Sequence, residues 1–285
     1  MIVGLSPGDG PVRIMTEATA LFDEEELRTL LQRQSFGHPL YFFKTIASTN
    51  DYARELAARD SPEGTLVISE EQTAGRGRMG KSWISPAGTG LWISLVLRPT
   101  FPPSQGPLIT PMTAVAVAGA IREVTGLSAG IKWPNDIIIN ERKAAGILME
   151  SSAGARSIRH IIVGIGINVN TEEFPEEIRE KATSLRICSG NKISRMEILI
   201  SVIRQLERLY SFVTPGGDPD IILKRYRSWS VTIGRMITAD RAGKKLTARA
   251  LDITATGGLL VRDQTGMTEE LISGEIQNLI FPVKK

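Results

Sequence analysis

The sequence is poor in the side chains that many enzymes use as nucleophiles or metal ligands. It contains one cysteine, Cys188, and two histidines, His38 and His160. A single cysteine excludes a disulfide framework within the chain and fits a reducing cytosol. Neither histidine lies in a recognisable catalytic motif. From the single cysteine we expect a cytoplasmic protein.

Long apolar runs and a strong charge of one sign are also missing. No stretch reaches the roughly 20 apolar residues of a membrane span, and the N-terminus lacks the charged and apolar regions of a signal peptide. The formal net charge is +3, with 23% charged residues, which is typical of a soluble protein and far from a dedicated nucleic-acid binder. The length of 285 residues favours two domains.

The most distinctive stretch that the sequence does contain is 72–83, which is rich in glycine and in the cations Arg76, Arg78 and Lys81, and has no carboxylate. Glycines let a backbone approach a ligand closely, and arginines offer planar donor forks that suit carboxylates and phosphates. The three cations should repel one another until an anion binds. We interpret the stretch as a mobile anion-binding loop that closes over its ligand; a solvated basic loop is the simpler alternative.

A second interpretation comes from the same residues. Gly75–Ser82 fits the P-loop pattern G-x-x-x-x-G-K-S. That pattern requires a preceding strand, which 65–69 predicts, and a helix directly after it. Residues 83–90 contain one proline and two glycines instead, and 91–97 then reads as a buried strand. A P-loop NTPase is therefore only an alternative.

Three further motifs accompany this loop. They read Lys132-Trp-Pro-Asn-Asp136, Arg142-Lys143-Ala-Ala-Gly146-Ile-Leu and Gly164-Ile-Gly-Ile-Asn168. Together with residues 72–83, and in this order, they resemble the motif set of the biotin protein ligases (biotin–[acetyl-CoA-carboxylase] ligases). The resemblance covers about residues 38–285. It implies an α+β fold, with a catalytic domain like that of class II aminoacyl-tRNA synthetases and biotin ligases, and a small C-terminal SH3-like β-barrel.

The expected domain organisation has three parts. Residues 1–37 form a leader and a short helix, 38–232 form the catalytic biotin- and ATP-binding domain, and 233–285 form the barrel. Five short β runs, with turns expected at Gly243, Gly257, Gly266 and Gly274, support the barrel independently. The winged helix-turn-helix that precedes the catalytic domain in some relatives needs roughly sixty residues, so we expect a form without it and no specific DNA binding.

Local patterns predict several elements of the catalytic domain. We expect a mixed or antiparallel sheet with helices on one face. The helix over 23–34 should bury Leu27, Leu30 and Leu31. Another helix should begin with Thr110 as N-cap and Pro111 at its first position, and end at Gly126. A strand should cover 40–46, and Ser194 with Glu197 forms a capping box for a helix that runs to about residue 212.

The resemblance also implies roles for individual residues. Catalytic roles fall to Lys143, Arg78 and Asp136, and Asp136 is also the expected Mg²⁺ ligand. The expected biotin-binding residues are Ser48, Thr49, Asn50, Gln72, Arg76, Gly77, Arg78, Lys143 and Gly146. The expected nucleotide-binding residues are Arg78, Trp83, Asn135, Lys143 and Asn168.

The residues themselves leave simpler interpretations open. Ser48 with Asp51 three positions later is also an ordinary helix N-cap. Lys143 beside an acidic residue is also an ordinary surface ion pair. Asn168, inside an apolar run, is also an ordinary buried asparagine whose amide has hydrogen-bond partners.

The reaction implied by the resemblance has two steps. The biotin carboxylate attacks the α-phosphate of ATP to give biotinyl-5′-AMP and pyrophosphate, and a lysine of a biotin carboxyl carrier protein then displaces AMP. Because two anions meet in the first step, catalysis should rest on charge neutralisation and positioning by Arg76, Arg78, Lys143 and Mg²⁺. The resemblance also allows a homodimer. Lipoate-type ligases share this adenylation chemistry, and the sequence pI of about 9.0 leaves a nucleic-acid-binding regulator as another alternative.

Overall fold

The computed structural model of the chain describes residues 21–154, 157–241 and 244–279. Within these residues the larger sheet has the strand order β1-β2-β3-β7-β6-β5-β4. Its strands are β1 (Leu40–Ile46), β2 (Leu66–Gln72), β3 (Gly90–Leu97), β4 (Gly130–Lys132), β5 (Asp136–Ile139), β6 (Arg142–Ala153) and β7 (Ile158–Asn168). Strands β1 and β2 are parallel and the other neighbours are antiparallel, so the expected mixed sheet is confirmed.

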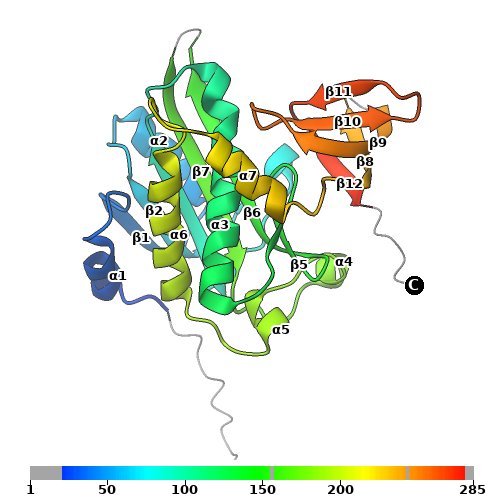
Figure 1. The fold of residues 1–285 in the computed structure, drawn as a ribbon. Helices are drawn as coiled ribbons and strands as arrows, with labels where there is room; N and C mark the ends of the chain where they lie inside the picture. Colours follow the sequence, from blue (N-terminus) through cyan, green and yellow to red (C-terminus); the bar gives the residue numbers. More distant parts are fainter. Residues whose placement is uncertain (1–20, 155–156, 242–243, 280–285) are drawn as a thin grey trace, which may run out of the picture.

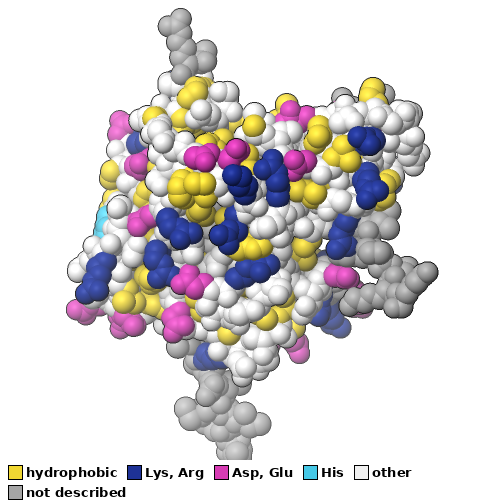
Figure 2. Space-filling view, in the orientation of Figure 1, with side chains coloured by type: hydrophobic (Ala, Val, Ile, Leu, Met, Phe, Trp, Pro, Cys, Tyr) yellow, Lys and Arg dark blue, Asp and Glu magenta, His cyan; other side chains and the backbone are white. Residues whose placement is uncertain are grey.

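Helices cover both faces of this sheet. The helical elements are α1 (Glu24–Leu31), α2 (Thr49–Ala58), α3 (Ile109–Thr125), α4 (Glu176–Arg179), α5 (Leu185–Ser189), α6 (Arg195–Tyr210) and α7 (Asp220–Trp229), with 3₁₀ turns η1 (Arg78–Gly80) and η2 (Pro103–Leu108). Figure 1 shows α3, α6 and α7 together on one side of the sheet. On that side, Figure 2 shows basic side chains interspersed with acidic and hydrophobic ones.

The alternation of side chains along β7 explains how the two faces differ. Ile161 and Val163 point into the main core with α3 and α6, whereas Ile162 packs against Ala53 and Ala57 of α2 on the other face. Successive residues of a strand point to opposite faces, so α2 lies across the sheet from α3 and α6. The expectation that all helices share one face was wrong, because the sequence pattern of a two-sided strand does not say which helix covers which side.

Two expectations, one about the buried face of α1 and one about the start of α3, also need correction. Leu27 and Leu31 of α1 are buried, but Leu30 is 39% exposed, because α1 contacts the body of the protein only along the narrow stripe that contains positions 27 and 31. Helix α3 begins at Ile109, since the turn η2 runs directly into it. Thr110 therefore lies within the first turn and does not act as the N-cap.

Other expected helix ends are confirmed. Ser194 accepts a hydrogen bond from the Glu197 amide at the start of α6, and Gly126 ends α3 in the left-handed conformation with φ of 71°. The stretch Pro103–Thr125 is long and apolar enough to cross a membrane by composition alone, but 67% of its most apolar window is buried. Its packing against α6 and the sheet accounts for its composition.

The C-terminal part contains a small antiparallel sheet. Its strands are β8 (Met236–Arg241), β9 (Lys244–Ile253), β10 (Leu259–Asp263), β11 (Thr268–Leu271) and β12 (Glu275–Leu279), in the order β11-β10-β9-β8-β12. This agrees with the expected barrel, although the turn expected at Gly243 lies outside the described residues. Trp133 donates from its indole N–H to the Gly257 carbonyl at 3.2 Å, which joins this sheet to the catalytic part.

A buried ion pair joins strands β2 and β3 of the larger sheet to α6. Arg195 Nη1 lies 2.7 Å from Glu70 Oε2, and their side chains are 5% and 1% exposed. The same guanidinium donates to the Gly90 carbonyl, and the Phe22 amide donates to Glu70. One buried pair thus joins α6, the end of β2, the start of β3 and the segment before α1.

Breaking this pair on one side should destabilise the protein strongly. We expect Arg195→Met to lower the free energy of unfolding by about 3–5 kcal/mol, because Glu70 would remain as a buried charge without its partner. The matched control is Arg186→Met, which removes a pair with Glu172 whose side chains are 36% and 65% exposed and should cost at most about 1 kcal/mol. Urea unfolding monitored by fluorescence measures both, and equal losses would contradict the assignment.

Candidate functional site

A cavity of about 420 Å³ opens on the α2 side of the sheet. Every site residue expected from the sequence lines it: Ser48, Thr49, Asn50, Gln72, Arg76, Gly77, Arg78, Trp83, Asn135, Asp136, Lys143, Gly146 and Asn168. Motifs separated by about a hundred residues along the chain are therefore neighbours in space.

Glycines form the floor of this cavity. A Cβ atom on Gly164 would lie 2.1 Å from Asn50 Oδ1, and one on Gly166 would lie 2.5 Å from Trp83 Nε1. Gly146 pairs with Gly166 across β6 and β7. A side chain at Gly164 or Gly166 would displace Asn50 or Trp83. Glycine is therefore required at these positions, since it lets the other residues approach the strands closely.

The residues at the start of α2 form one end of the cavity. Ser48 caps the helix by accepting from the Asp51 amide. The Thr49 amide and hydroxyl both donate to Gln72 Oε1, at 2.9 and 3.0 Å, and Gln72 Nε2 donates to Ser85. The residues that form the helix start also line the cavity, so the capping interpretation and the binding interpretation are compatible.

Asn50 is held at both ends of its amide. Its Oδ1 accepts from Ser94 Oγ at 2.6 Å, and its Nδ2 donates to Glu150 Oε2 at 2.8 Å. The amide is 5% exposed, so these partners fix its orientation.

The glycine-rich loop folds back on itself. The Trp83 amide donates to the Gly75 carbonyl at 2.8 Å, and the Gly77 amide donates to Lys81 at 2.7 Å. Residues 83–89 form no helix, and β3 follows at Gly90. The P-loop interpretation is therefore wrong.

The cations of this loop have acceptors within the protein. Arg76 Nη2 lies 2.6 Å from Asp51 Oδ1 and 3.3 Å from Glu150 Oε1. Arg78 donates to Asn135 Oδ1 and to the Gly274 carbonyl, both at 3.2 Å. The expected repulsion between the cations is thus offset for Arg76 by carboxylates from α2 and β6. Arg78 reaches the segment that precedes β12, so the C-terminal sheet contributes to the site.

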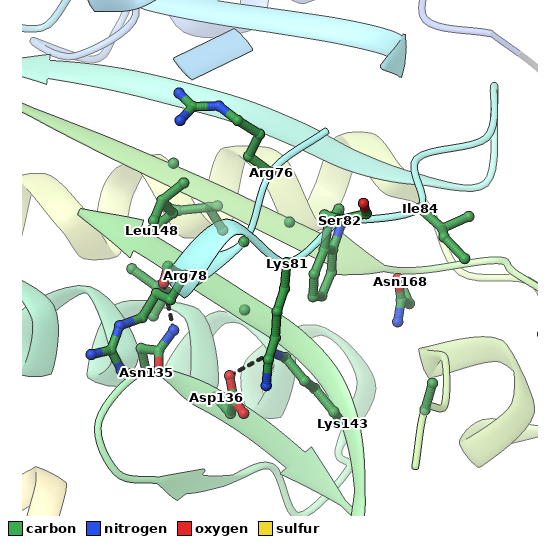
Figure 3. Close-up of a pocket in the computed structure, with 18 of the residues that line it drawn as sticks. Arg76, Arg78, Lys81, Ser82, Ile84, Asn135, Asp136, Lys143, Leu148 and Asn168 are labelled. Carbon is green, nitrogen blue, oxygen red and sulfur yellow. Dashed lines mark hydrogen bonds and ion pairs between the residues drawn. The ribbon is translucent and has the colours of Figure 1, made fainter. Parts of the chain in front are cut away.

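Lys143 lies between the loop and β5. Its Nζ is 2.6 Å from Asp136 Oδ1 and 5.1 Å from the centre of the Trp83 ring. Figure 3 shows the Lys143–Asp136 pair below the loop, with the Lys81 side chain pointing toward it. The side chain of Tyr226 is fully buried near this pair. Its burial, and to a lesser extent the negative charge of Asp136, raises the pKa of Tyr226, so its hydroxyl stays neutral.

A β-bulge places Lys143 on the cavity side. Asp136 pairs with Gly146 and Ile137 with Ala145, but Ile138 pairs with Lys143, which leaves Ala144 as the extra residue. Without that residue the alternation along β6 would turn Lys143 away from the face that contains Gly146. The Lys143 backbone is also fixed, because its amide donates to Lys181 at 2.8 Å and its carbonyl accepts from the Thr183 amide at 2.9 Å.

Asn135 and Asn168 are held by backbone carbonyls. Asn135 Nδ2 donates to Ile147 at 2.7 Å, and Asn168 Nδ2 donates to Thr183 at 3.0 Å. Each amide therefore has a structural partner and still lines the cavity, so both interpretations of these asparagines remain compatible with the geometry.

Several residues of the site were not expected from the sequence. Lys81 was assigned only to the loop, and Lys132, Lys181 and Ile276 also line the cavity. Asp51, Ser94 and Glu150 support it from behind. For Glu150 a signal existed, because it lies four residues after Gly146 on the same strand and therefore on the same face.

Comparisons with known proteins agree on one family. The sequence profile of the "Biotin/lipoate A/B protein ligase family" matches residues 42–168, and that of the "Biotin protein ligase C terminal domain" matches residues 232–277. The bifunctional ligase/repressor BirA of Bacillus spizizenii is 40% identical over 257 residues, which are 89% of this chain and 78% of that protein.

Two further comparisons extend this result. The biotin–[acetyl-CoA-carboxylase] ligase of Mycobacterium tuberculosis is 29% identical over 265 residues, covering 90% of this chain and 96% of that protein. The solved structure of the biotin protein ligase from Aquifex aeolicus in complex with biotin and ATP superposes with a TM-score of 0.72 at 30% identity, over 84% of this chain and 98% of that one.

The close approach of Trp83 to Gly166 leads to a prediction that can be tested without a ligand. Gly166→Ala should push the Trp83 ring out of its place, since no room exists for a Cβ atom beside Nε1. We expect a red shift of the tryptophan emission and faster trypsin cleavage of residues 76–81. In the matched control, Gly119→Ala, the new Cβ lies 3.6 Å from the Trp229 ring, so emission and cleavage should stay unchanged. Equal behaviour of the two variants would contradict the packing argument.

Proposed function

Because this chain belongs to the biotin protein ligase family, we infer that it joins biotin to a lysine of a biotin carboxyl carrier protein at the expense of ATP. In the first step the biotin carboxylate attacks the α-phosphate and pyrophosphate leaves. In the second, the lysine amine attacks the acyl carbon of biotinyl-5′-AMP, loses a proton and releases AMP. The observation that best supports this function is the convergence of the four motifs on one cavity.

We propose that the ureido group of biotin binds at the α2 end of the cavity. A urea has donors and an acceptor in one plane, and the hydroxyls of Ser48 and Thr49 and the amides of Asn50 and Gln72 can match both kinds. The cavity of about 420 Å³ beside these residues has room for the fused bicyclic ring. The other proposed biotin contacts are Arg76, Gly77, Arg78, Lys143 and Gly146.

The nucleotide would then occupy the opposite end. Trp83 offers an aromatic face, and Asn135 and Asn168 offer amides whose positions are already fixed by backbone carbonyls. Phe174, Ile178 and Ala182 add an apolar wall beside Asn168. Lys143 and Arg78 would lie between the two substrates, where the carboxylate meets the α-phosphate.

The catalytic task in this arrangement is to bring two anions together. Lys143, Arg78 and Asp136 are the proposed catalytic residues. Cations held in fixed positions stabilise the charge that develops on the phosphate without the reorganisation that water would require. The ion pair with Asp136 and the bulge in β6 hold Lys143 in such a position.

The donor set also fits a magnesium ion that is bound mainly by its substrate. Among the described residues no group of three His, Cys, Asp or Glu side chains can hold a metal. Mg²⁺ commonly uses one or two carboxylates together with substrate phosphates, so Asp136 is the one ligand that we propose on the protein side. When bound with ATP, the ion would neutralise phosphate charge.

Several predictions from the sequence stay proposals. We propose a catalytic domain over 38–232 and a barrel over 233–285; residues 1–20 of the predicted leader and 280–285 lie outside the described residues. The relatives named biotin–[acetyl-CoA-carboxylase] ligase support a carboxyl carrier protein of that carboxylase as the acceptor. A cytoplasmic location, the absence of specific DNA binding and a homodimer remain predictions.

Ligand identity is tested by thermal stabilisation. Biotin with Mg-ATP should raise the melting temperature more than either compound alone, because the bound intermediate stabilises only the folded state. Lipoate with Mg-ATP is the control for the related ligases. A shift with lipoate as large as the shift with biotin would contradict the assignment to biotin.

The role of Lys143 is tested by its removal. Lys143→Ala should lower the rate of biotinyl-5′-AMP formation by roughly 10²–10³, the typical loss of one group that stabilises a developing charge. Stability should change little, because the Lys143 side chain is 34% exposed and partly exposed pairs contribute little. Pyrophosphate release measures the rate. Lys224→Ala, at an exposed position on α7, is the control. A near-normal rate for Lys143→Ala would mean that Lys143 only forms an ordinary surface ion pair.

A further inference from the structure

We propose that Asp51 and Glu150 are positioning residues that fasten the glycine-rich loop, through Arg76, to the end of the cavity where the biotin ring system binds. The inference rests on the proposed function and assigns a role to the two carboxylates that contact the loop through Arg76. We refer to Asp51, Glu150 and Arg76 as the carboxylate clasp.

The geometry of the clasp joins three separate elements. Asp51 is on α2, Glu150 is on β6, and Arg76 is on the loop that covers the cavity. One guanidinium nitrogen, Nη2 of Arg76, contacts Asp51 at 2.6 Å and both Glu150 oxygens at 3.3 and 3.4 Å. The loop is thus tied at one point to the helix and to the floor strand.

Charge balance indicates what Arg76 does. Arg54 also contacts Asp51, at 2.6 Å, and Glu150, at 3.6 Å. Two arginines and two carboxylates cancel, so Arg76 offers little net attraction to an anionic substrate at a distance. Its contribution is therefore to hold the loop, while charge neutralisation at the reacting atoms falls to Lys143 and Arg78.

The clasp also touches the binding surface directly. Glu150 accepts from Asn50 Nδ2 at 2.8 Å with the oxygen Oε2, which also faces Arg76. The orientation of the Asn50 amide and the position of the loop therefore depend on the same carboxylate. Release of Arg76 would change the environment of Glu150 and loosen Asn50, so the loop and the ring-binding residues are coupled.

The strength of the clasp suits a loop that must open. The side chains of Arg76, Asp51 and Glu150 are 38%, 36% and 27% exposed, and ion pairs of this kind are weak and sensitive to salt. A buried pair would hold the loop shut, whereas this one can separate when biotin enters and reform afterwards.

The test uses Glu150→Gln and Asp51→Asn in the full chain. Glutamine can still accept from Asn50 but loses the charge that holds Arg76. Each variant should raise the KM for biotin about three- to tenfold, as expected for the loss of one or two partly exposed ion pairs, with kcat for adenylate formation within about threefold of the original value. In the double variant the dependence of KM on NaCl concentration should become weaker than in the original chain, because only the contacts of the anionic substrates with Lys143 and Arg78 remain sensitive to salt.

Limited trypsin digestion supplies a readout that does not depend on activity. Cleavage after Arg76 requires its side chain to leave the clasp, so both variants should increase cleavage there relative to cleavage after Lys81. The matched control is Arg54→Gln, which removes another partner of the same carboxylates and lies outside the cavity lining. Its KM should be unchanged or lower, because both carboxylates are then available to Arg76.

The outcomes separate this inference from the proposed function. An unchanged KM and an unchanged cleavage ratio in Asp51→Asn and Glu150→Gln would overturn the clasp while biotinyl-5′-AMP formation continues. An effect of Arg54→Gln as large as that of Glu150→Gln would also overturn it, since a general charge effect would then be responsible. If the original chain formed no biotinyl-5′-AMP, the function would fail, and the cleavage ratio would still decide whether the clasp holds the loop. Melting temperatures identify a misfolded variant, and the other carboxylate variant then decides.

Discussion

The site depends on one feature of the sheet: next to the cavity, strands β6 and β7 have apolar side chains on one face and the glycines Gly146, Gly164 and Gly166 on the other. Ile161, Val163 and Ile165 pack into the core with α3 and α6, which makes the strands rigid. On the opposite face Gly164 and Gly166 leave the space that Asn50 and Trp83 occupy. A cavity with a flat and immobile floor follows from this division, because the same strands supply both the core and the space.

Three cations beside the cavity are held in place by acceptors within the protein. Arg76 contacts carboxylates, Arg78 contacts an amide oxygen and a carbonyl, and Lys143 contacts Asp136. Cations fixed in this way are already in position when substrates arrive and need little reorganisation. The described partners differ in kind, since Arg76 contacts two carboxylates whereas Arg78 donates to an amide oxygen and a carbonyl.

The sequence predicted the parts of this structure that depend on local patterns. Strand 40–46, the cap at Ser194, the end of α3 at Gly126 and the residues that line the cavity all follow from motifs or periodicity. Contacts between distant residues could not be predicted. Arg76 and Glu150 are 74 positions apart, and Arg78 and Gly274 are 196 apart, so only the folded chain shows that they meet. The start of α3 was missed because a 3₁₀ turn overrode a good local capping signal at Thr110.

The bulge at Ala144 shows why alternation alone misplaces the central lysine. Counting by two from Gly146 along β6 assigns position 144 to the cavity face and Lys143 to the core. A buried lysine in an apolar core would lose its hydration without compensation. One extra residue between the pairs Ile137–Ala145 and Ile138–Lys143 reverses that assignment. Lys143 then lies diagonally across from Asp136 on the cavity face, where the pair at 2.6 Å forms. The backbone bonds from Lys143 to Lys181 and Thr183 hold the displaced strand in place. A single inserted alanine therefore decides whether this chain has a cation where its two anionic substrates meet.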